Sequence, residues 1–165
     1  MALQNAVGLN YALGIAGQQV VIGQAEYLAY NPLSDGTVKA GAFCFKKAGS
    51  GNGEVFAHAS LTGTDVLGFV ERVVDSYIPT VGGDATQVYP AGAALTVAIR
   101  GQYYIEAPAA IAADGLKVWV NGSTGAIRIG AEESGSTEID TGWTCRIPNG
   151  GTSAAQGDIV IVERF

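Results

Sequence analysis

The stretch Gly101–Ile127, GQYYIEAPAAIAADGLKVWVNGSTGAI, decides the fold class of this 165-residue chain. It has the pattern of an apolar strand, a turn of small residues, a second strand and a hairpin turn at Asn-Gly. Within LKVWV, Leu116, Val118 and Val120 alternate with residues that point the other way. This two-residue alternation is typical of a strand that buries one face.

Two further segments alternate in the same way. In ALTVAIRG, Leu95, Val97 and Ile99 are expected on one face of a strand, with the residues between them on the other. In GWTCRIP, the buried face is expected to begin at Trp143 and to continue through Cys145 and Ile147. The period of two predicts half-buried strands in both places.

The remaining segments also favour strands. TDVLGFVERVVDSY (64–77) could form a helix, but its β-branched residues and Gly68 favour a strand. The closing DIVIVERF (158–165) is more continuously apolar, which predicts a strand covered on both faces. Turn-forming clusters such as NPLSDG, YPAG and PNGG separate these runs. The chain is therefore predicted to be all-β, as a small antiparallel β-barrel or sandwich.

The beginning of the chain differs from the rest. Gly8, Gly14 and Gly17 stand at intervals that suit neither a stable helix nor a regular strand. We expect an extended N-terminal arm that leads into a first strand (1–24), followed by a single β-barrel or sandwich domain (25–165). An ordinary first strand with a frayed end is the alternative.

Charge and composition restrict the partners. The net charge of −6 leaves no basic face for phosphates, so nucleic acid is not an expected partner. The N-terminal segment lacks the basic and apolar regions of a signal peptide, and no stretch predicts a membrane span. Only 15% of the residues are charged, so small and apolar side chains must cover much of the surface. Such a surface favours assembly with other proteins.

Residues suited to catalysis are few. His58 is the sole histidine, so the usual zinc ligands cannot be assembled, and we expect no metal, cofactor or catalytic residue. Cys44 and Cys145 are interpreted as buried thiols, although a disulfide between them remains open. The glycine-rich loop at 49–53 lacks the lysine of a phosphate-binding loop, and Glu132–Glu133 is interpreted as a solvated loop.

The aromatic residues allow two interpretations. Trp119, Trp143, Tyr103 and Tyr104 could form a platform on which sugars stack. Aromatic residues scattered over strands more often belong to the core or to an interface, because they bury large areas. A carbohydrate-binding β-sandwich is therefore kept as an alternative, which requires at least two exposed rings on one face.

The segment Tyr89–Ile127, with the closing strand GDIVIVERF, resembles the structural cement, or capsid decoration, proteins of tailed bacteriophages. The matching pattern is an entry turn, a strand that ends at Arg100-Gly101, a passage of small residues, the strand LKVWV and a hairpin. The early AVGLNYALGIAGQQV also resembles the arm of that family. The likeness is clearest over Tyr89–Ile129 and weaker over Ala6–Phe45.

This resemblance implies a protein without a chemical reaction. It implies a homodimer or homotrimer, made in the bacterial cytoplasm, that binds the exterior of the capsid and bridges major capsid protein subunits to stabilise the virion. Another virion β-domain, from the tail or baseplate, is the nearest alternative. The candidate contact elements are the arm Leu3–Ile22 and the end of the chain. The candidate residues are Leu3, Leu9, Tyr11, Leu13, Ile15, Arg164 and Phe165.

Overall fold

The computed structural model describes residues 14–21, 24–46, 54–56, 66–73 and 87–165. Within these ranges the regular elements are strands and one 3₁₀ turn, so the all-β prediction is confirmed. The elements are β1 Glu26–Tyr27, β2 Leu33–Ser34, β3 Phe43–Lys46, β4 Glu54–Phe56, β5 Val66–Val70, β6 Val97–Glu106, β7 Lys117–Asn121, β8 Ile127–Gly130, β9 Glu138–Arg146, the 3₁₀ turn η2 Pro148–Gly150 and β10 Ile159–Arg164.

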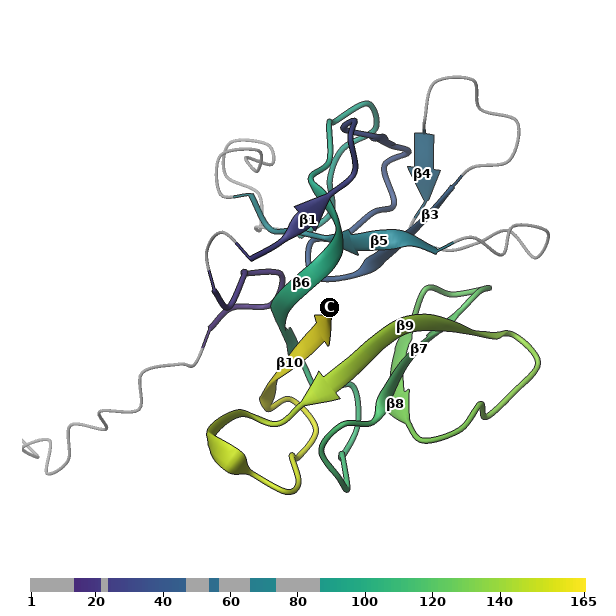
Figure 1. Cartoon of the computed structure of the whole chain (residues 1–165). Coiled ribbons are helices and arrows are strands. Elements are labelled where there is room, and N and C mark those ends of the chain that lie inside the picture. Colours follow the sequence, from purple (N-terminus) through teal and green to yellow (C-terminus); the bar gives the residue numbers. More distant parts are fainter. Residues whose placement is uncertain (1–13, 22–23, 47–53, 57–65, 74–86) are drawn as a thin grey trace, which may run out of the picture.

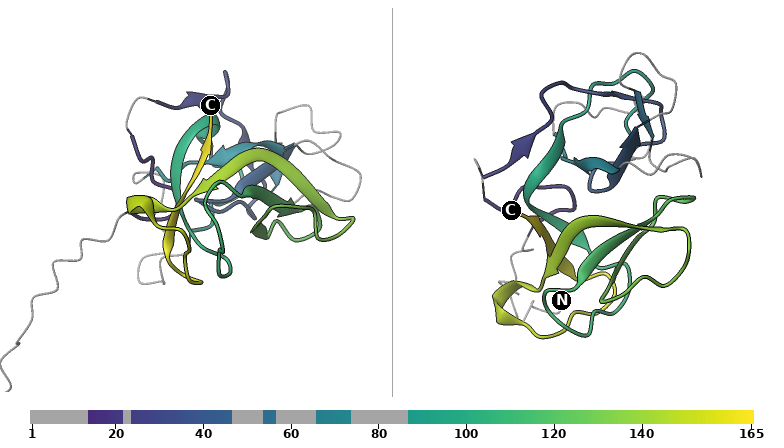
Figure 2. Two further views of the ribbon diagram at one scale, coloured as in Figure 1. Left: turned by 60° about the horizontal axis from the view of Figure 1, so that its bottom comes forward. Right: turned by 45° about the vertical axis from the view of Figure 1, so that its right-hand side comes forward.

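The strands form one sheet in the order β2-β4-β3-β5-β6-β10-β9-β7-β8, and β1 pairs with β6. All the pairings are antiparallel except that of β2 with β4, which is parallel. The sheet curls into a half-barrel, with β1 to β5 in one half and β7 to β10 in the other (Figures 1 and 2). The long β6 runs through both halves and connects them.

Strand β6 changes its buried face along its length. Glu26 lies opposite Arg100 and Tyr27 lies opposite Ala98, so the pairing with β1 skips Ile99. Because of this irregularity, Ala98 and Tyr103 both face the same core, although strict alternation would place them on opposite faces. The predicted face of Leu95, Val97 and Ile99 is therefore wrong at Ile99.

The curled sheet encloses the main core. Phe43, Phe69, Tyr103 and Trp143 pack there with ring centroids 4.9 to 6.1 Å apart. The predicted inward residues of β7 and β9, such as Val118, also lie in this core. Such aromatic packing adds to the stabilisation from burial alone.

A second core fills the other face of the first half of the sheet. It contains Cys44, Leu95 and Val97, together with Val38, Ala40, Val70 and Tyr89. Cys145 lies in the main core, and both cysteines are free, so the interpretation as buried thiols is confirmed. Burial raises the pKa of each thiol to about 12.

Candidate interaction surface

Residues of the predicted arm lie along the second half of β6. The amide of Gly17 donates to the carbonyl of Tyr104 (2.8 Å), the amide of Tyr104 donates to the carbonyl of Gln18 (2.9 Å), and that of Val20 donates to Gln102 (2.9 Å). Gln19 lies opposite Tyr103 in an antiparallel bridge. The segment 17–20 thus satisfies backbone groups of β6 that would otherwise form an open edge.

Two glycines permit this close approach. A Cβ at Gly14 would overlap the ring of Tyr104. Gly17 has a φ of +85°, and a Cβ there would lie 2.8 Å from the amide nitrogen of Gly41. The carbonyl of Gly17 also accepts the amide of Arg72 (2.9 Å). Gly14 and Gly17 are therefore positions where the arm touches the body of the protein, and Gly8 lies outside the described residues.

The structure locates three of the seven predicted contact residues. Ile15 is 51% exposed and Phe165 is 74% exposed, so both present apolar surface to solvent. Arg164 is exposed at the end of β10, and its guanidinium lies beside Gly142. The other four predicted residues lie outside the described part of the chain: Leu3, Leu9, Tyr11 and Leu13.

A polar surface runs across β6, β10 and β9, on the side away from the main core. We call it the outer face, and its side chains are Gln102, Tyr104, Ile161, Glu163, Thr144 and Arg146. At its centre, Gln102 Nε2 donates to Glu163 Oε2 (2.7 Å), and Arg146 Nε lies 3.4 Å from Glu163 Oε1. The carboxylate of Glu163 is thus held between two donors.

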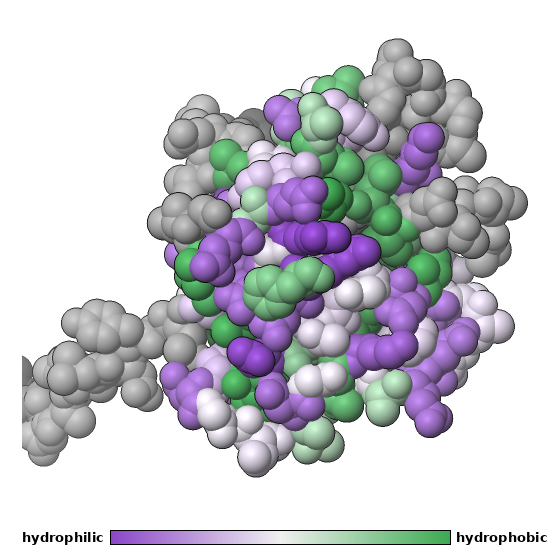
Figure 3. All heavy atoms as spheres, in the orientation of Figure 1, coloured by the Kyte–Doolittle hydropathy of each residue, from purple (hydrophilic) through white to green (hydrophobic). Residues whose placement is uncertain are grey.

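Figure 3 shows hydrophilic side chains gathered around the point that Figure 1 marks as the end of the chain. Two further ion pairs join side chains of neighbouring strands. Lys117 Nζ lies 2.8 Å from Asp140 Oδ2, and Arg100 lies 3.5 Å from Glu26. Phe165 therefore projects from a hydrophilic part of the surface.

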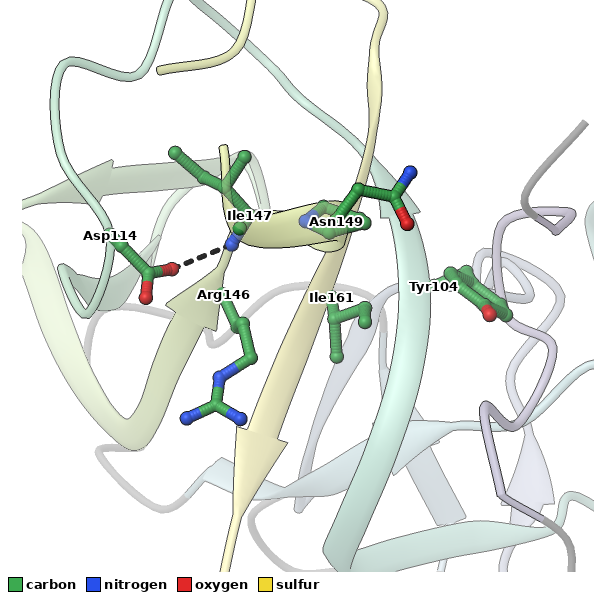
Figure 4. A pocket seen from close by; sticks show the side chains of 8 residues that line it. Tyr104, Asp114, Arg146, Ile147, Asn149 and Ile161 are labelled. Atoms are coloured by element: carbon green, nitrogen blue, oxygen red, sulfur yellow. Dashed lines mark hydrogen bonds between the residues drawn. The ribbon is translucent and has the colours of Figure 1, made fainter. Parts of the chain in front are cut away.

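A pocket of about 400 Å³ opens at the end of the outer face where β10 begins (Figure 4). Its lining combines apolar and polar side chains: Tyr104, Asp114, Arg146, Ile147, Pro148, Asn149, Gly150 and Ile161. The carboxylate of Asp114 accepts the amide of Ile147 (2.7 Å), which fixes the wall formed by η2. Asn149 has a φ of +59°, a conformation that asparagine tolerates better than most residues.

Other exposed apolar side chains were missed by the sequence reasoning. Tyr30 is 49% exposed, and Tyr27 is also exposed. The buried hydroxyl of Tyr103 donates to that of Tyr27 (3.5 Å), and burial raises the pKa of Tyr27. These residues follow the predicted arm in QAEYLAY, where no period of two distinguishes an exposed tyrosine from a buried one.

The sugar-stacking interpretation fails at the tryptophans. Trp143 is buried in the main core, and Tyr103 is buried beside it. Trp119 is only 8% exposed, because Lys117 and Arg128 lie over its ring at 5.4 and 5.8 Å. Its indole nitrogen donates to the carbonyl of Gly130 (3.0 Å). Three of the four rings named for the platform are thus structural, and only Tyr104 lies on the outer face.

The described residues hold no group of three or more His, Cys, Asp or Glu side chains placed to bind a metal. His58 and the loop at 49–53 lie outside the described part of the chain. Glu132 and Glu133 are exposed in the loop after β8, as expected. No helix in the described ranges has the length and apolar character needed to cross a membrane.

Comparisons with known proteins bear on the fold and on the family of the chain. A search among curated proteins gave no match. A solved structure described as the capsid of Myoviridae phage XM1 shares the fold, with a TM-score of 0.61 and 17% identity, over 99% of this chain and 97% of that one. Residues 3–164 match the model of a family described as structural cement protein (E217 gp24/Pam3 gp6). The chain therefore belongs to the structural cement protein family.

Proposed function

We propose that this protein binds the exterior of a bacteriophage capsid, bridges neighbouring major capsid protein subunits and stabilises the particle. Membership of the cement family supports a structural role in the capsid. We propose that it acts there as a homo-oligomer without catalysis or a cofactor, and without a nucleic acid or membrane partner.

The observation that carries the proposal is the docked segment of the arm. Backbone hydrogen bonds hold residues 17–20 on β6, while Ile15, beside them, exposes half of its surface. Gly14 lies against the ring of Tyr104, so this part of the arm meets the body beside the outer face. We infer that residues 1–24 form an arm that reaches from the body (25–165) to the shell, and that Ile15 and Phe165 contact capsid subunits.

The proposed mechanism is thermodynamic linkage. A protein that binds the assembled shell and not its separated subunits stabilises the shell by an amount that grows with the logarithm of its free concentration over its Kd. At a free concentration about 100 times its Kd, each site contributes about 2.7 kcal/mol. When one protein touches two subunits, this free energy opposes their separation, and an oligomer joins several subunits at once.

The test uses capsid shells that lack the protein. Purified wild-type protein is expected to bind them in a fixed stoichiometry and to raise their melting temperature. A variant that lacks residues 2–13 and an Ile15→Ala variant are expected to bind more weakly. Tyr30→Ala is the matched control, because Tyr30 is as exposed as Ile15 and lies outside the proposed arm.

The two parts of the proposal fail separately. If wild-type protein does not bind shells, or binds without raising their melting temperature, the proposed function is wrong. If the truncated and Ile15→Ala proteins bind as the wild type does, the capsid function stands and the assignment of the arm is wrong.

A further inference from the structure

The pocket at the end of the outer face holds a carboxylate that has a free oxygen. Asp114 Oδ1 accepts the amide of Ile147 (2.7 Å), which fixes the orientation of the carboxylate. In the part of the chain that the structure describes, Asp114 has no ion-pair partner and its Oδ2 accepts no hydrogen bond. An exposed, oriented carboxylate with one oxygen left over is suited to bind a cation.

Arg146, which also lines the pocket, does not balance this carboxylate. Arg146 Nε lies 3.4 Å from Glu163 Oε1, and Figure 4 shows the side chain of Arg146 extending away from Asp114. Two carboxylates and one guanidinium therefore leave this part of the surface with an excess of negative charge. Such an excess favours a cationic ligand over an anionic one.

The walls of the pocket suit a long side chain. The apolar and aromatic residues among them are Tyr104, Ile147, Pro148 and Ile161. A lysine can pack its aliphatic stem against such walls while its ammonium group reaches a polar partner. The volume of about 400 Å³ is large enough for this side chain. Arginine fits less well, because its bidentate contact would compete with the Ile147 amide for Asp114 Oδ1.

The pocket lies beside the docked arm. Tyr104 lines the pocket, and Gly14 packs against the ring of Tyr104. Ile15, which we propose to contact a capsid subunit, comes next in the chain and is half exposed. Residues 1–13 contain no lysine or arginine, so no side chain of the arm before Gly14 can supply the cation. The capsid subunit that the arm contacts is therefore the expected source of the ligand.

We propose that the pocket binds a lysine side chain of a capsid subunit, with Asp114 as its ion-pair partner. This inference rests on the proposed function and adds the chemistry by which one part of the surface recognises the shell. Docking removes both charges from water, so loss of either partner would leave the other buried and unpaired. The ion pair therefore selects the position and orientation of the protein on the shell.

The first test compares binding to capsid shells that lack the protein. Asp114→Asn removes the charge and keeps an oxygen that can accept the Ile147 amide, and it is expected to weaken binding about 10-fold or more. Asp158→Asn is the matched control, because Asp158 accepts the amide of Ala155 (2.7 Å) in the same way and lies outside the pocket. If wild-type protein does not bind shells, the proposed function is wrong and the lysine site falls with it. If it binds and Asp114→Asn binds equally tightly, only the lysine site is wrong.

The second test identifies the ligand. A carbodiimide couples a carboxylate to a lysine amine in contact with it, without a spacer, and mass spectrometry locates the product. Wild-type protein on shells is expected to give a peptide in which Asp114 is joined to a lysine of a capsid subunit. Asp114→Asn protein is expected to give no cross-link at this position. If Asp114 forms no such cross-link while exposed carboxylates such as Glu132 are modified by the reagent, the lysine site is absent.

Two other occupants of the pocket have distinct signatures. If a second copy of the protein fills it, Asp114 is joined to a lysine of this chain in protein without shells. If residues 1–13 of the same chain fill it, Asp114 is joined to the amino group of Met1. Either product, in place of a cross-link to a capsid subunit, overturns the proposal.

Discussion

Replacement of Gly17 by alanine is expected to release the docked arm and to leave the rest of the fold intact. At a φ of +85°, an alanine costs about 1 to 2 kcal/mol relative to glycine. Its Cβ would also lie 2.8 Å from the amide nitrogen of Gly41 and 3.0 Å from Arg72 Cβ. Because the nearest obstacle is backbone, relief of this overlap requires the arm or the loop at Gly41 to move.

The free energy that holds the docked segment on β6 is of the same order as this cost. The three hydrogen bonds between residues 17–20 and β6 contribute about 0.5 to 1.5 kcal/mol each, and the entropy of ordering the segment offsets part of this. A loss of about 2 kcal/mol corresponds to a roughly 30-fold rise in the population of the released arm. The main core contains no residue of this segment, so global unfolding is expected to change little.

Hydrogen exchange measures the release directly. In Gly17→Ala, the amides of Val20 and Tyr104 are expected to exchange about 30-fold faster, while the core amide of Cys145 keeps its protection. Gly157→Ala is the matched control, because Gly157 has a φ of +86° and nothing lies within 4 Å of its added Cβ. If the amides of Val20 and Tyr104 keep their protection in Gly17→Ala, the arm is not packed closely at Gly17.

Three further outcomes follow from the core and from the ionisable groups. Trp143→Ala is expected to lower the free energy of unfolding by about 3 to 5 kcal/mol in urea titrations, because it leaves a cavity in the main core; a loss below about 1 kcal/mol would contradict this packing. The Arg128 guanidinium lowers the pKa of Glu138, so this ion pair stabilises the fold at neutral pH and its contribution is lost as the pH falls through the lowered pKa. Glu138→Gln should therefore lower the free energy of unfolding at pH 7, and this free energy should fall less on acidification than that of the wild type. If both proteins lose the same free energy of unfolding as the pH falls, the coupling is refuted. Cys44 and Cys145 should not react with a thiol reagent in the native state and should both react in denaturant, because burial raises the pKa of each to about 12.

Strands whose own residues show an alternating or continuously apolar pattern were predictable from the sequence. Val118 and Val120 face the main core as their period of two indicates, and the closing strand is buried at Val160, Ile161 and Val162. The sequence could not show the change of face in β6. That change depends on the register with β1, which lies about seventy residues earlier in the chain.

The interaction surface was predictable only in part. Ile15 and Phe165, which the sequence analysis offered as contact residues, are exposed, and their contacts stay a prediction. The pocket was not found, because its lining comes from β6, the loop at Asp114, η2 and β10, which are far apart in sequence. Tyr30 carries no signal that separates it from a core tyrosine such as Tyr103.

The docked arm and the outer face are suited to two different kinds of contact. A rigid face with paired charges is suited to a fixed partner, because little conformational entropy is lost when it is buried. An arm held by a few backbone hydrogen bonds can change direction at a small cost in free energy. Such an arm is suited to contact with a large repetitive surface. If pairing of two copies uses the outer face, Phe165→Ala should reduce the avidity for shells, whereas loss of residues 2–13 should reduce the affinity of each copy. Binding curves at several protein concentrations separate the loss of avidity from the loss of affinity. Only the loss of avidity disappears when a covalent link restores the dimer.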